Sequence, residues 1–294
     1  MFEKIDPPNM EKISFRNGVL IDRDNAVVIG SIDKYANDEV AHTCVFSWTR
    51  KKNWYVRIID WTADSIGIYG KGIHDVVISG PEGKVLDLST DIEKEIRNRE
   101  NNPAVVRSLR RIQGELYAVG MNSLVCIRRE NGEWDSLIDK ITKRLRFEDI
   151  AGIDDNLCLV GWDGEIWFFN GKYWISSNSP TNLILTSVCV SNAGVFYCCG
   201  QQGMILKGRE AEWEIINQDL TTEDFWDISE FDGKILVSSL KFTYELTARG
   251  LEEINFDKQY PLSSYKLVSI PGQLWNIGEK SIFENIGGKW KKVI

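Results

Sequence analysis

A repeat of about 40 residues runs through almost the whole 294-residue chain. Each copy contains a short apolar run that ends in Gly or Ser, followed by a tight turn and a second apolar run. The runs end at Gly30, Gly80, Gly120, Gly161, Gly200, Ser238 and Gly278, which are 50, 40, 41, 39, 38 and 40 positions apart. A period of this length is typical of repeat folds, such as solenoids and propellers.

Every copy divides further into four strand-sized pieces. In the fourth copy these pieces are residues 149–153, 157–160, 165–169 and 172–175. Gly and Asn between them supply the positive φ that tight hairpins require. The last piece begins at a recurrent tryptophan, which we interpret as a core residue between repeats: Trp54, Trp134, Trp174, Trp213 and Trp290. Four short antiparallel strands in 40 residues correspond to one propeller blade.

Seven such copies predict an all-β fold, a seven-bladed β-propeller of four-stranded antiparallel blades. A closed ring protects the sheet edges that an open solenoid would leave bare. We therefore expect residues 1–294 to form a single propeller domain. Because the last copy supplies all four of its strands, residues 1–17 remain as an N-terminal extension. We expect residues 11–15 to pair beside the final strand, 289–294, and latch the ring.

One sequence motif resembles a known group of propellers. Gly-x-x-Gly-x-Ile at residues 161–166 is followed by Gly-x-x-Trp at residues 171–174. This pattern resembles the repeats of Ycf48-like and bacterial-neuraminidase-repeat propellers, over residues 105–294. The Asp-box, the Gly-His and Trp-Asp pairs of WD40 blades and the double Gly of kelch blades are absent. The resemblance implies the fold only, because one fold serves many functions.

Charge and composition exclude several classes of function. The 35 Lys and Arg against 43 Asp and Glu give a net charge of −8, which opposes nucleic-acid binding. The longest uncharged stretch, residues 173–206, is interrupted by Asn, Pro and Gly and cannot supply a spanning helix. The first residues contain no apolar run like that of a secretory signal, so we expect a cytoplasmic protein. The six cysteines include no CxxC pair and are interpreted as buried thiols in a reducing compartment.

Chemistry-bearing residues are sparse. Neither His42 nor His74 has a companion at a metal-ligand spacing, so no metal or other cofactor is expected. Asp149 and Asp227 occupy equivalent positions at the start of an innermost strand and are predicted to face the channel. They suit either an acid and base pair for glycoside chemistry or acceptors for neighbouring backbone N–H groups, and we favour the second interpretation.

The strongest functional signal is a break in the period. The first copy is about ten residues longer than the others, and residues 31–43 account for the excess, between its second and third strands. A long loop on a rigid scaffold is a common binding device, although surface insertions are also tolerated without function. The other turns between second and third strands, and the connections between blades, are expected on the same face.

That face is predicted to bind a protein partner through aromatic and acidic side chains. The candidate contacts are Tyr35, Asp38, Glu39, Trp162, Asp163, Glu223, Phe225 and Trp226. Further aromatics on this side, which suit either contact or packing between blades, are Phe242, Tyr244 and Tyr260. A basic cluster suits a phosphate or an acidic partner, or simply a solvated connection, which we favour: Arg107, Arg110, Arg111, Lys140, Lys143, Arg144 and Arg146.

We therefore expect a non-enzymatic protein-binding propeller, a monomer or heterodimer that contacts neither nucleic acid nor membrane. An acidic ring of this kind suits an immunity protein that neutralises a basic toxin or enzyme. The alternative is a carbohydrate-binding or glycoside-active propeller.

Overall fold

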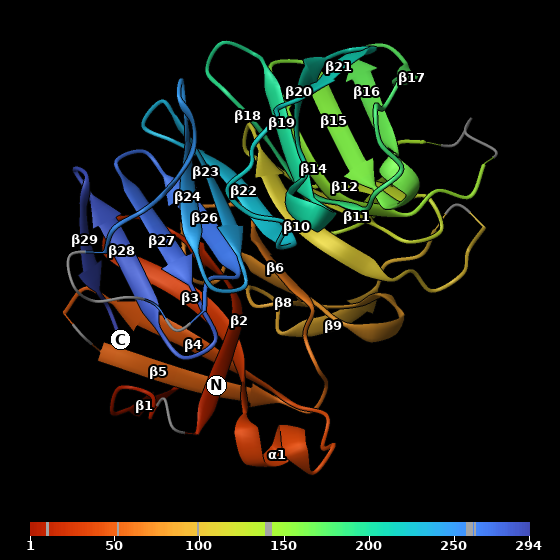
Figure 1. Ribbon diagram of the computed structural model, residues 1–294. Helices are drawn as coiled ribbons and strands as arrows, with labels where there is room; N and C mark the ends of the chain where they lie inside the picture. Colours follow the sequence, from red (N-terminus) through yellow and green to blue (C-terminus); the bar gives the residue numbers. More distant parts are fainter. Residues whose placement is uncertain (10–11, 52, 99, 139–142, 257–260, 262) are drawn as a thin grey trace.

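The computed structural model describes residues 1–9, 12–51, 53–98, 100–138, 143–256, 261 and 263–294. These residues form seven antiparallel sheets, numbered here as blades 1 to 7 along the chain (Figure 1). The prediction of an all-β, seven-bladed propeller is confirmed. The innermost strands contact one another in the cyclic order β2, β6, β10, β14, β18, β22, β26 and back to β2.

Each blade consists of four strands that are consecutive in the sequence. Blade 1 contains β2 (Ile13–Leu20), β3 (Asn25–Ile32), β4 (Thr43–Thr49) and β5 (Asn53–Ile59). Blade 2 contains β6 (Ser65–Ile68), β7 (Val76–Ser79), β8 (Lys84–Asp87) and β9 (Ile92–Glu95). Blade 3 contains β10 (Val106–Ile112), β11 (Glu115–Gly120), β12 (Leu124–Arg128) and β13 (Trp134–Ser136). Blade 4 contains β14 (Phe147–Ile153), β15 (Asn156–Gly161), β16 (Ile166–Asn170) and β17 (Trp174–Ser176).

The same order continues to the end of the chain. Blade 5 contains β18 (Leu185–Val190), β19 (Phe196–Gly200), β20 (Ile205–Arg209) and β21 (Glu212–Ile215). Blade 6 contains β22 (Phe225–Phe231), β23 (Lys234–Ser239), β24 (Thr243–Thr247) and β25 (Gly250–Glu253). Blade 7 contains β26 (Lys266–Ile270), β27 (Gln273–Ile277), β28 (Ile282–Ile286) and β29 (Lys289–Lys292). Short helical segments are α1 (Asp33–Asn37), η1 (Pro81–Gly83), η2 (Trp162–Gly164) and η3 (Gln201–Gly203).

The predicted latch is wrong. Ile13–Leu20 is the innermost strand of blade 1 and pairs with β3, so the extension is shorter than residues 1–17. The extra strand is β1 (Glu3–Ile5), which pairs with β5 at the outer edge of blade 1 (Figure 1). Blades 7 and 1 close the ring by packing: Phe15 N donates to Glu279 O at 2.8 Å, and Trp48 lies against Trp275.

Apolar side chains fill every interface between neighbouring blades. Seven buried clusters, one for each interface, form the core. Trp54 is fully buried against Phe15 and Phe46. The equivalent tryptophans are half-buried and pack against their own clusters: Trp134, Trp174, Trp213 and Trp290. The interpretation of this repeated Trp as a core residue is confirmed for Trp54, whereas the other four tryptophans are only half-buried against the core.

The glycine that ends each apolar run allows a close crossing of two backbones. A Cβ at Gly161 would lie 2.0 Å from Arg146 O, and one at Gly278 would lie 1.9 Å from Ser263 O. In both blades this oxygen belongs to the connection that enters the blade. The connections and the turns between second and third strands therefore meet on one side of the ring, as expected. We call this side the insertion face, because residues 33–42 also lie on it.

Candidate functional site

The long segment of blade 1 lies where the sequence predicts it, between β3 and β4, and contains helix α1. His42 holds this segment to the blade. Ile32 N–H donates to His42 Nε2 at 2.7 Å, and Nδ1 lies 2.7 Å from Val40 O. A carbonyl only accepts, so these partners assign the proton to Nδ1 of a neutral imidazole. Tyr35 packs edge-on against the same ring.

A second anchor joins the segment to blade 7. Asp33 accepts hydrogen bonds from Lys280, at 2.5 Å, and from Ser14, at 2.6 Å. Burial alone would raise the pKa of Asp33, but these hydrogen bonds and the Lys280 charge hold it below its usual value. Beyond the helix, Asp38 and Glu39 are exposed, and Tyr35 is 42% exposed. The segment is therefore fixed at its base and offers three predicted contact residues to solvent.

The turn between the second and third strands of blade 4 carries two more predicted contacts. Trp162 Nε1 donates to Glu148 at 2.6 Å, and the Arg146 guanidinium lies 4.5 Å from the centre of the Trp162 ring. Asp163 is exposed and pairs with Arg146 at 2.5 Å. Trp162 is thus half-buried and held in a fixed orientation.

The predicted contacts of blade 6 divide between surface and core. Trp226 is 49% exposed, whereas Phe225 is fully buried against Tyr244, so the prediction that Phe225 contacts a partner is wrong. Glu223 is half-buried, and its Oε2 atom is buried without a hydrogen bond from any described residue. Tyr244 is also buried, Phe242 packs beside it, and Tyr260 lies outside the described residues.

A repeated β-bulge explains why Trp226 points outward. In five blades the pairing of the first and second strands skips one residue of the innermost strand. The skipped residues are Arg16, Arg107, Glu148, Thr186 and Trp226, and the corresponding positions in blades 2 and 7 are Asp64 and Tyr265. These seven residues, the mouth ring, line a cavity of about 480 Å³ at the insertion-face end of the channel. A bulge bends the strand and re-aims the side chain.

The next residue of each innermost strand faces the channel itself. This channel ring consists of Asn17, Ser65, Ser108, Asp149, Ser187, Asp227 and Lys266. Three members accept a hydrogen bond from the following blade: Ser65 from Leu109 N, Asp149 from Val188 N and Asp227 from Leu267 N. The sequence signal that locates the channel ring is the polar residue at one register position of each blade.

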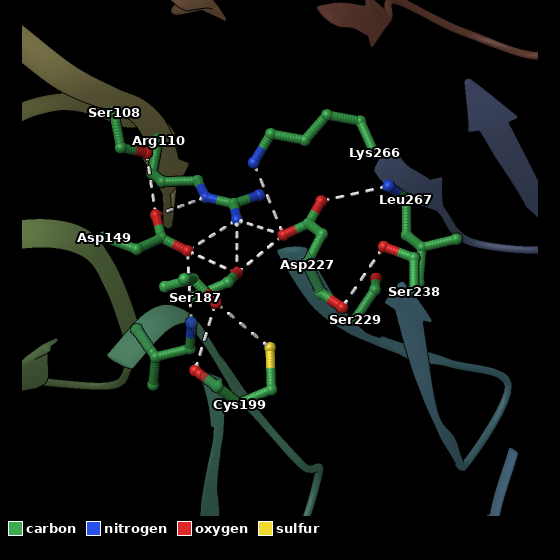
Figure 2. A network of polar contacts seen from close by, with 12 residues as sticks. Ser108, Arg110, Asp149, Ser187, Cys199, Asp227, Ser229, Ser238, Lys266 and Leu267 are labelled. Atoms are coloured by element: carbon green, nitrogen blue, oxygen red, sulfur yellow. Dashed lines mark hydrogen bonds and ion pairs between the residues drawn. The ribbon is translucent and has the colours of Figure 1, made fainter. Parts of the chain in front are cut away.

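Arg110 crosses the channel and joins the acidic members of the ring (Figure 2). Its Nε and Nη2 atoms donate to the two oxygens of Asp149 at 2.8 and 2.6 Å. Nη2 also lies 3.1 Å from Asp227 Oδ1, and Lys266 Nζ lies 3.4 Å from the same oxygen. Ser187 Oγ is 2.7 Å from Asp149 Oδ2 and 2.6 Å from Asp227 Oδ1.

The electrostatics of this network support the structural interpretation of the two aspartates. Burial alone would raise the pKa of Asp149, but the charge and hydrogen bonds of Arg110 hold that pKa well below its usual value. The Arg110 pKa is raised in turn, because the two carboxylates outweigh the effect of burial. Both carboxylates are engaged within the ring, and each accepts a backbone N–H group.

The basic cluster is distributed over separate ion pairs and hydrogen bonds. Arg107 pairs with Glu148, Arg144 with Glu100 and Lys143 with Glu165. Arg111 donates to Gly70 O. Lys140 lies outside the described residues. Apart from Arg110, which lies in the channel network, these contacts support the interpretation of a charged, solvated connection.

The described residues contain neither a metal-binding cluster nor a membrane-spanning helix. No group of three or more His, Cys, Asp or Glu side chains is placed to hold a metal ion. Within the same residues, no helix has the length and apolarity needed to cross a membrane.

Comparison with solved structures identifies other propellers. The structure of YCF48 bound to D1 peptide has a TM-score of 0.69 and 14% identity, over 97% of this chain and 94% of that one. YCF48 from Cyanidioschyzon merolae has a TM-score of 0.54 and 11% identity, over 78% of this chain and 84% of that one. At these identities the similarity shows the fold alone, and it confirms the Ycf48-like resemblance at that level.

Comparison of sequences is more specific. No protein-family model matches the chain. The chain is 31% identical over 293 residues to the immune protein Tsi7 of Pseudomonas aeruginosa. The alignment covers 94% of this chain and 95% of Tsi7, so the similarity extends over all seven blades rather than one repeat. The chain belongs to the Tsi7 family of immune proteins.

Proposed function

We propose that this protein is an immunity protein, which binds a toxin protein through the insertion face and neutralises it without catalysing a reaction. Membership of the Tsi7 family supports an immune role. The six buried thiols support a reducing compartment, so we propose that the protein acts in the cytoplasm.

The distribution of exposed apolar side chains supports the insertion face, rather than the opposite face, as the binding surface. Among the described residues, six large apolar side chains of the insertion face are at least 40% exposed: Tyr35, Val40, Val105, Leu220, Trp226 and Leu240. The turns of the opposite face expose Ile92, Tyr173 and Ile286. Exposed apolar residues surrounded by polar groups are typical of protein-protein interfaces. The insertion adds a projecting element to the face that has more exposed apolar side chains.

The partner is proposed to be basic. The chain carries a net charge of −8, and Asp38 and Glu39 project from the insertion. Opposite charges on two proteins accelerate their association, and salt screens this effect. We expect a one-to-one complex whose association rate falls as the salt concentration rises.

Affinity capture with the tagged chain, followed by purification of the captured toxin, tests the proposal. The purified chain should bind the toxin in calorimetry and suppress its activity. A triple variant, Tyr35→Ala, Asp38→Ala and Glu39→Ala, removes exposed side chains of the insertion but keeps His42 and Asp33, which anchor it. The matched control carries Tyr173→Ala, Asp155→Ala and Glu115→Ala on the opposite face.

The insertion variant should bind at least about tenfold more weakly, whereas the control should bind like the wild type. Both variants should keep the circular dichroism spectrum of the wild type. Equal losses in the two variants would contradict the insertion face. A wild-type chain that binds glycans on an array and no toxin would support the carbohydrate-binding alternative instead.

A further inference from the structure

Both aromatic and charged side chains line the cavity at the mouth of the channel. Blades 4 to 6 contribute Trp162 and Trp226 beside the charged Glu148 and Asp224, and Trp226 leaves half of its side chain exposed. Blades 1 to 3 contribute Arg16, Asp64 and Arg107. Indole rings beside charged side chains suit a ligand group that is both flat or apolar and charged.

Most charges around this cavity neutralise one another. Arg107 pairs with Glu148 at 2.9 Å, and Lys266 pairs with Asp227 at 3.4 Å. Among the described residues that line the cavity, three charged side chains are in no ion pair: Arg16, Asp64 and Asp224. Two carboxylates against one cation leave the mouth with an excess of negative charge.

The two remaining carboxylates keep acceptor capacity. Asp224 Oδ1 accepts from Gln202 N at 2.8 Å, which leaves Oδ2 for a second donor. The surrounding protein raises the pKa of Asp64 by removing water, and the charges of Arg107 and Arg16 only partly oppose this effect. A positive group bound beside Asp64 would favour its charged form.

We propose that the mouth cavity receives a cationic side chain, an arginine or lysine, from a protruding loop of the toxin. Its charge lies against Asp224, and its guanidinium plane or alkyl stem packs on the neighbouring Trp226, while Asp64 adds a second carboxylate to the same cavity from blade 2. Indole is the best aromatic partner for a cation, and partner cations are attracted by the acidic chain. The five bulges supply a pocket at the centre of the face, where interface residues contribute most. This inference rests on the proposed function and identifies its central contact.

Three single variants and two matched controls test the pocket. Trp226→Ala should weaken toxin binding by at least about tenfold, and Asp64→Asn and Asp224→Asn by about threefold to tenfold. Tyr173→Ala and Asp155→Asn, which lie on the opposite face, should change affinity by less than about twofold. Affinities are measured by calorimetry with the purified toxin, and thermal melting confirms that each variant is folded.

Double-mutant cycles identify the group that enters the cavity. Each exposed Arg and Lys of the toxin is changed to Ala and measured against wild type, Asp64→Asn and Trp226→Ala. For one basic residue of the toxin, the substitution to Ala should weaken binding to either variant several-fold less than it weakens binding to the wild type. Additivity for every basic residue, or coupling of Trp226 to an acidic or apolar toxin residue, would overturn the proposal.

The outcomes separate this inference from the proposed function. If the wild type binds the toxin while Trp226→Ala, Asp64→Asn and Asp224→Asn bind equally well, only the mouth cavity is ruled out. If the wild type binds no toxin, the proposed function fails, and the inference fails with it.

Discussion

Arg110 and Asp227 are 117 positions apart in the sequence and meet inside the channel, where Arg110 Nη2 lies 3.1 Å from Asp227 Oδ1. The same guanidinium binds Asp149, so one side chain of blade 3 is joined to blades 4 and 6. Ser187 and Lys266 extend the contacts to blades 5 and 7. The network therefore connects five of the seven blades at the axis of the ring.

Arg110→Met should lower the free energy of unfolding by about 3–5 kcal/mol, because it leaves the buried Asp149 without its paired cation and Asp227 with Lys266 alone. Arg111→Met is the control, since Arg111 is exposed and donates only to Gly70 O among the described residues. Urea unfolding measures both. Adding Asp149→Asn and Asp227→Asn to Arg110→Met should restore part of the loss, and no restoration would contradict the electrostatic explanation.

The pH dependence of stability should contain a contribution from Asp149. Arg110 outweighs burial and holds the pKa of Asp149 below the unfolded value of about 3.9. The charged carboxylate therefore stabilises the folded chain fully above about pH 4–5, and this stabilisation is lost as the pH falls through the folded pKa. Between about pH 5 and pH 3, urea unfolding should show a steeper loss for the wild type than for Asp149→Asn. Equal slopes would contradict the prediction.

The repeated tryptophans should differ in their contribution to stability. Trp54→Ala removes a fully buried ring and should cost about 3–5 kcal/mol. Trp174→Ala removes a half-buried ring and a 3.0 Å hydrogen bond to Leu137 O, and should cost less. Thermal and urea unfolding should rank wild type above Trp174→Ala, and Trp174→Ala above Trp54→Ala. The opposite ranking would contradict the assigned burial.

Thiol chemistry should be suppressed in the folded chain. All six cysteines are buried, and burial raises the pKa of Cys44 to about 11. Burial likewise raises the pKa of Cys158, Cys198 and Cys199. Because the thiolate is the reactive form, Ellman's reagent at pH 8 should label the native protein slowly and all six thiols in denaturant. Rapid labelling of the native protein would show that the blades open readily.

The sequence predicts the ring better than the site, because the blades depend on residues close together in the sequence, whereas the site depends on contacts between distant residues. Period and turn residues specify each blade locally, which is why the seven blades and the insertion of residues 31–43 could be predicted. The orientations of Phe225 and Trp226 depend on a β-bulge, which alters the alternation of side chains and leaves no clear sequence signal. The contact of Arg110 with Asp227 depends on the width of the channel, which only the closed ring determines.

The β1 strand has a consequence for contacts between copies of this protein. It covers the outer edge of β5, whereas the outer strands of the other six blades each pair on one side only within the described residues. These strands would be templates for stacking of one molecule on another. Their charged side chains oppose it: β9 contains Glu93, Lys94 and Glu95, and β29 contains Lys289, Lys291 and Lys292. Neutralising them should promote edge-to-edge aggregation and filament growth, although no blade would lose its fold.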